Sequence, residues 1–164
     1  MIISHILPLL DSRGVSTNYA VIAASSIGAA QVLGRLVLVT VERRLSMLFI
    51  SMCSFVGLLF ASVNLAFAGT ATIILCLFVC LQGGSAGIGS IAKPTVTADL
   101  LGSTNFGAIS AMVSIAHMLG FAFGPGLSSL IWSVTDYDTL IKVTGTLALI
   151  GVFSLFIAQK SSRN

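Results

Sequence analysis

GAISAMVSIAHMLGFAFGPGLSSLIW, residues 107–132, is the stretch that decides the fold of this chain. It is long enough to cross a bilayer, because about 20 apolar residues at helical rise span the hydrocarbon core. It contains no Asp, Glu, Lys or Arg, and one imidazole, His117, lies near its middle. Gly120 and Gly124 are spaced for close helix approach, while Pro125 frees carbonyls that neighbouring helices must satisfy. This pattern predicts a membrane helix that packs and bends around a polar point.

The composition extends this conclusion to the whole chain. Of the 164 residues, 56% are hydrophobic and only 8% are charged, and the mean hydropathy is +1.06. A soluble domain carries about 25% charged residues, so this chain cannot cover a globular surface with polar groups. We therefore predict an all-α, polytopic integral membrane protein that lies in the lipid bilayer.

Polar turns divide the chain into a partial helix and five full transmembrane helices, which form a single helical domain over residues 1–164. Pro94 is expected to end one span, because the residue before a proline is disfavoured in the helical conformation. A loop over residues 93–105 would follow. The expected spans are 1–10 (partial), 17–41, 45–68, 70–92, 107–132 and 140–158.

Basic residues set the expected orientation, since cytoplasmic loops of membrane proteins carry the excess of Lys and Arg. A cytoplasmic carboxyl terminus leaves only Arg13 and Lys142 outside. The inside residues are then Arg43, Arg44, Lys93, Lys160 and Arg163. The sequence thus predicts a multi-pass protein of the inner (plasma) membrane with a cytoplasmic carboxyl terminus.

Polarity divides the spans into two groups. Residues 45–68 and 140–158 carry few polar side chains at mid-membrane depth, whereas 17–41, 70–92 and 107–132 carry several. Polar groups in membrane helices usually face a protein interior or an aqueous cavity. We therefore expect the first two spans to face lipid and the other three to face a cavity.

Several motifs occur in an order that resembles one transporter family. HILPLLDSRGVSTNYAVIAASSIGAAQVLGR, residues 5–35, is followed by the basic turn Glu42-Arg43-Arg44. PTVTADLLG, residues 94–102, and Gly120 to Pro125 come later. In this order the motifs resemble helices seven to twelve of the major facilitator superfamily. The cytoplasmic-loop motif matches only in part, because the family's Asp and the Gly before the final basic pair are absent.

This resemblance implies the carboxyl-terminal half of a secondary transporter. Such transporters bind substrate near the bilayer midplane, between two six-helix halves. We therefore expect the chain to be a fragment of a larger two-half transporter, a split-gene product or a degenerate remnant. An amino-terminal transporter half, from the same gene or a separate chain, is its expected partner.

Four side chains are candidates for contact with a small solute. His117 and Ser114 share a helix face, and intramembrane ionisable groups are functional candidates by default. Gln82 and Gln31 lie near the middle of two other polar spans. The alternative at each position is a structural hydrogen bond between helices. For His117 the two interpretations are equally favoured, and for Gln82 the structural one is the commoner case.

A second group is expected to act in gating or packing. Arg35 could form a gate ion pair with a carboxylate such as Asp99, contact an anionic substrate or extend to the headgroups. Arg43 and Arg44 belong to the cytoplasmic loop. Small residues spaced by four favour close helix approach, and the residues expected to pack helices are Gly83, Gly87, Gly120, Gly124 and Pro125.

The sequence argues against other classes of function. No mid-membrane carboxylate or HExxH motif is present, so we expect neither an enzyme nor a bound metal or cofactor. Basic residues are scattered at the ends of spans, which argues against nucleic acid as a partner. Cys53, Cys76 and Cys80 lie in apolar runs and are expected to behave as small hydrophobic residues.

Two functions remain open from the sequence. The preferred one is transmembrane transport of a small polar or anionic solute by alternating access, as half of a secondary active transporter. The other is a non-transporting role as a membrane scaffold or assembly subunit, or as an inactive transporter remnant. A homodimer of two such halves is a weaker third arrangement.

Overall fold

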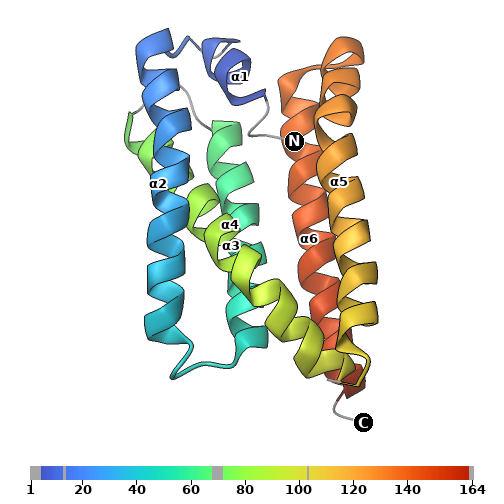
Figure 1. The fold of residues 1–164 in the computed structure, drawn as a ribbon. Helices are drawn as coiled ribbons and strands as arrows, with labels where there is room; N and C mark the ends of the chain where they lie inside the picture. Colours follow the sequence, from blue (N-terminus) through green and yellow to red (C-terminus); the bar gives the residue numbers. More distant parts are fainter. Residues whose placement is uncertain (1–4, 13, 68–71, 103, 163–164) are drawn as a thin grey trace.

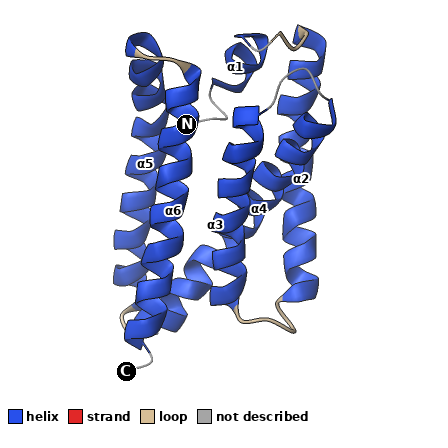
Figure 2. Ribbon diagram, turned by 180° about the vertical axis from the view of Figure 1, so that it is seen from behind, coloured by secondary structure: helices blue, strands red, loops and turns tan. Residues whose placement is uncertain are grey.

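The computed structural model describes residues 5–12, 14–67, 72–102 and 104–162. All regular secondary structure in this part of the chain is helical (Figure 2). In chain order the helices are α1 (Ile6–Ser12), α2 (Thr17–Val41), α3 (Met47–Phe67), α4 (Thr72–Leu101), α5 (Phe106–Val134) and α6 (Tyr137–Ser162). The last five helices are long and apolar enough to cross a membrane, so the predicted all-helical fold with five helices of spanning length is confirmed.

The carboxyl end of α4 differs from the predicted one. The sequence places a helix end before Pro94, but α4 continues through this proline to Leu101. Helix-breaking residues are tolerated in membrane helices, where neighbouring groups replace the lost backbone hydrogen bond. Beyond the proline, the Thr97 hydroxyl donates to the Lys93 carbonyl at 2.8 Å. The helix ends instead at Leu101. The next residue, Gly102, has a φ of 82° and adopts the left-handed conformation common just after helix carboxyl ends.

Helix α4 is the centre of the packing. It crosses the bundle diagonally, from beside α2 at one end to α5 and α6 at the other (Figure 1). Helices α2 and α3 both pack extensively against α4, and α3 packs in turn against α6. One side of α3, within residues 45–68 that are predicted to face lipid, is therefore covered by α4 and α6. Small side chains on that side, among them Ser51, Ser54 and Ser62, are buried because they permit close approach.

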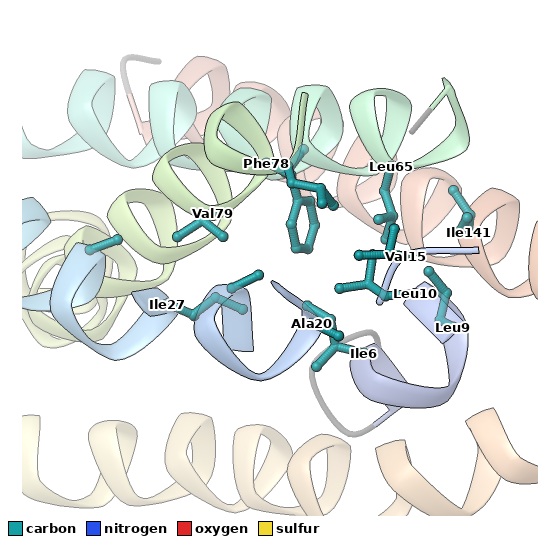
Figure 3. Close-up of a cluster of buried hydrophobic side chains, with 14 residues drawn as sticks. Ile6, Leu9, Leu10, Val15, Ala20, Ile27, Leu65, Phe78, Val79 and Ile141 are labelled. Carbon is teal, nitrogen blue, oxygen red and sulfur yellow. The ribbon is translucent and has the colours of Figure 1, made fainter. Parts of the chain in front are cut away.

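A hydrophobic cluster closes one end of the bundle (Figure 3). Helix α1 contributes Ile6, Leu9 and Leu10, which are almost completely buried. They join side chains from α2, α3, α4 and α6 in one continuous core. Short α1 therefore ties the first part of the chain to the last helix, although it is too short to span a membrane.

Helix α5 is the least covered of the long helices. It runs beside α6 in both views (Figures 1 and 2), yet only Gly124 and Ser128 are buried along it. The turn between α2 and α3 lies at the same end of the bundle as the α4–α5 turn and the end of α6 (Figure 1). Arg13 and Arg163, which the orientation argument used, lie outside the described residues.

Candidate functional site

The site begins at the contact between α2 and α4, where glycines replace side chains. A Cβ added to Gly83 would lie 2.5 Å from the Ala30 Cβ and 2.7 Å from the Ile27 carbonyl. A Cβ at Gly87 would lie 3.0 Å from the Gln31 Cα. The backbones of α2 and α4 therefore touch, and this contact fixes the positions of Gln31 and Gln82 along the two helices relative to each other.

Gln31 and Gln82 both lie beside this contact and are half-buried. Within the described part of the chain, neither amide side chain makes a hydrogen bond. An amide left unpaired in hydrocarbon is costly. These two amides therefore require water, a solute or another protein surface if this region lies at membrane depth.

His117 occupies the middle of one face of α5. Helical spacing places Ser110, Ser114, Gly124 and Ser128 on the same face. Gly124 and Ser128, which follow His117, are buried, and Ser110 and Ser114, which precede it, are half-buried. His117 itself is exposed. The face is thus covered toward both ends and open in the middle, where the imidazole lies.

Gly120 lies in the same uncovered middle part of α5 as His117. No described atom lies within 4 Å of the position that its Cβ would occupy, so no helix of this chain approaches α5 there. Gly124 is buried, and Pro125 lies within α5, which continues to Val134. The close approach expected at Gly120 is therefore not made by any described residue of this chain.

Many other polar side chains are satisfied within the described chain, including the hydroxyls of Ser26 on α2, Ser90 on α4 and Ser128 on α5, which bond carbonyls of their own helices. The Asn64 amide of α3 donates to the Phe60 carbonyl at 3.0 Å, and the Ser54 hydroxyl donates to the Ser85 carbonyl at 2.6 Å. In α6, Thr144 and Thr146 each bond a carbonyl one turn earlier. The unpaired mid-helix amides and imidazole thus lie on α2, α4 and α5.

The expected gating residues are exposed. Arg35 on α2 and Asp99 on α4 form no ion pair among the described residues. Arg43 and Arg44 lie in the turn after α2 and are also exposed. The structure therefore separates the expected gate pair from the polar mid-helix residues.

An aromatic contact at the closed end was not predicted. The rings of His5 and Trp132 have centroids 6.4 Å apart, and Trp132 stacks on Tyr137 at 5.8 Å. The pairing of His5 with Trp132 depends on α1 folding back onto the α5–α6 turn, and no local spacing reveals this.

No family model, curated protein or solved structure matches the chain. What the structure shows is an all-helical fold with five helices long and apolar enough to cross a membrane, and polar groups unpaired within the described chain on three of them. Among the described residues, no group of three or more His, Cys, Asp or Glu side chains could hold a metal ion. The chemistry that the site offers is hydrogen bonding by two amides, one imidazole and several hydroxyls.

Proposed function

We propose that this chain acts in transmembrane transport of a small polar or anionic solute, as the carboxyl-terminal half of a secondary transporter resembling the major facilitator superfamily. In this proposal the chain pairs with an amino-terminal half and rocks against it around a central site. In the proposed orientation, the carboxyl terminus lies on the cytoplasmic side of an inner (plasma) membrane. The motif order supports the family, and the basic residues at one end support the orientation.

One observation carries the proposal. The unpaired side chains of Gln31, Gln82 and His117 lie at mid-span of three helices, and α5 is open rather than covered around His117. Polar groups at this depth in membrane proteins mark solute or ion pathways. A scaffold subunit needs no such groups, whereas a solute site needs hydrogen-bond donors that are free to bind.

Ligand-dependent stability of the protein, isolated from its native membranes with any bound partner, tests the proposal. A panel of small organic anions and neutral polar solutes is screened by thermal shift, because a ligand that binds only the folded state raises the melting temperature. Any solute that stabilises the protein is then tested for uptake into proteoliposomes. We expect at least one solute to pass both tests.

Matched variants locate the site. Gln82→Ala and His117→Ala are expected to abolish the thermal shift and the uptake, while Asn64→Ala, which removes an amide already bonded within α3, leaves both in place. Melting temperatures without ligand show that the variants fold. Absence of any stabilising solute and of any uptake, with a non-transporter as the copurifying partner, would instead establish the scaffold role.

A further inference from the structure

A groove separates α2 from α3 on the outer surface of the bundle. These helices are joined by a short turn, yet they hardly pack against each other. The groove contains an open pocket with a volume of about 170 Å³. Its lining comes from α2, α3, α4 and the turn: Val37, Leu38, Val41, Leu45, Phe49, Ile50, Cys53, Ser54, Ser85 and Ile88.

Contacts with α4 hold the groove open. A Cβ at Gly34 of α2 would lie 2.8 Å from the Gly84 Cα. Gly57 of α3 meets the Ser85 side chain instead, on a different side of α4. Because α2 and α3 are each fixed to α4 through a glycine, they cannot close on one another, and α4 forms the floor between them.

The walls of the groove are apolar and its mouth faces outward. Val37 is 53% exposed and Phe49 is 50% exposed, whereas Leu38 and Ile50 below them are 1% and 5% exposed. The hydroxyl of Ser54 is already bonded to the Ser85 carbonyl. Ser85, the other serine of the lining, is 8% exposed, and the rest of the lining is Cys53 and hydrocarbon side chains, so the groove suits an aliphatic chain.

Positive charge lies at the end of the groove. Arg43 and Arg44 are exposed and lie between two lining residues, Val41 and Leu45. The Arg44 and Leu45 amides both donate to the Val41 carbonyl, which holds the turn against the groove. Glu42 is the one carboxylate of this turn, so the turn keeps a net positive charge. Among the described residues, neither arginine forms an ion pair.

We propose that this groove binds an anionic phospholipid, with part of one acyl chain between α2 and α3 and the phosphate at Arg43 and Arg44. Clusters of basic residues beside membrane helices bind anionic headgroups, and arginine is well suited to phosphate because its planar guanidinium donates two hydrogen bonds at once. The proposal depends on the chain lying in a bilayer and not on transport. Its test and the test of transport can therefore fail separately.

Cys53 allows a direct test, because it lines the groove. The full chain is placed in nanodiscs of phosphatidylcholine, with or without phosphatidylglycerol, and alkylated with N-ethylmaleimide. Mass spectrometry then gives the rate at each cysteine. We expect phosphatidylglycerol to slow alkylation of Cys53 several-fold and to leave Cys76 and Cys80 unchanged, because these two are exposed on α4 outside the groove.

Charge variants separate a site from general attraction to an anionic surface. Arg43→Gln with Arg44→Gln is expected to remove the protection of Cys53. It should also weaken phosphatidylglycerol binding in native mass spectrometry by roughly thirty-fold, since each basic residue contributes about five-fold. Lys93→Gln with Lys160→Gln makes the same charge change at residues that do not line the groove and should leave both readouts unchanged.

Three outcomes overturn the proposal. The first is equal alkylation of Cys53 in both bilayers. The second is equal slowing of all three cysteines, which would reflect the surface charge of the bilayer alone. The third is protection of Cys53 that survives the double arginine substitution.

Discussion

Single glycines determine how closely α2 and α4 approach. A Cβ at Gly87 would overlap the Gln31 backbone, which cannot move without shifting the helix. We therefore expect Gly87→Ala to destabilise the protein by about 1–3 kcal/mol, the usual range for overpacking. Gly28→Ala on α2 is the matched control, because no described atom lies within 4 Å of its Cβ position.

Thermal unfolding in detergent measures the difference between these two variants. The control should be unchanged or slightly more stable, since alanine favours a helix over glycine by about 1 kcal/mol. Equal melting temperatures for the two variants would mean that α2 and α4 do not touch at Gly87. The spacing of Gly83 and Gly87 predicts a packing face from sequence, whereas Gly34 and Gly57 are lone glycines whose contacts depend on which helix lies opposite.

Among the elements, α4 gives the clearest difference between sequence and structure. Sequence predicts a loop from Lys93, but the helix continues to Leu101. Backbone amides of residues 96–101 should therefore resist hydrogen exchange, because each bonds to a carbonyl one turn earlier. Exchange measured by mass spectrometry should be slow in this segment. Exchange as fast as that of the turn at 104–105 would favour the loop.

The spans themselves were largely predictable, because length and hydropathy determine them. Residues 17–41 coincide with α2, and residues 45–68 differ from α3 by one or two residues at each end. What the sequence could not reveal is how closely α3 packs against α4. Ser54 and Ser62 are satisfied by backbone carbonyls and Gly57 fits against α4, so the low polarity of α3 hides an inner face.

Besides the hydrophobic cluster, an aromatic contact links His5, the residue before α1, to the end of α5. Trp132 lies between His5 and Tyr137, and aromatic pairs contribute about 0.5–1.5 kcal/mol beyond burial. Trp132→Ala should therefore lower the melting temperature and increase proteolysis near α1. Phe123→Ala, on the same helix, removes a ring that is 62% exposed and should have little effect. Equal effects would show that the ring contact does not hold α1.

Across the whole molecule, some parts of the helices are buried by neighbouring helices and others are not, and this difference agrees with the proposed function. One end is closed by the hydrophobic cluster of α1 and its neighbours, while the middle of α5 is uncovered. The sequence identified His117, Gln82 and Gln31 as polar points. It could not reveal that all three remain unpaired within the described chain, because that depends on the distance between helices.

We expect these unpaired side chains to border water at mid-membrane depth. The most direct measurement is modification of single cysteines by a charged, water-soluble methanethiosulfonate in source membranes, after Cys53, Cys76 and Cys80 are replaced by Ser. His117→Cys and Gln82→Cys should react, whereas Ile150→Cys, on α6 and 56% exposed to lipid in this account, should not. If His117→Cys and Gln82→Cys resist the reagent as Ile150→Cys does, no aqueous path reaches this site and the transport proposal is contradicted.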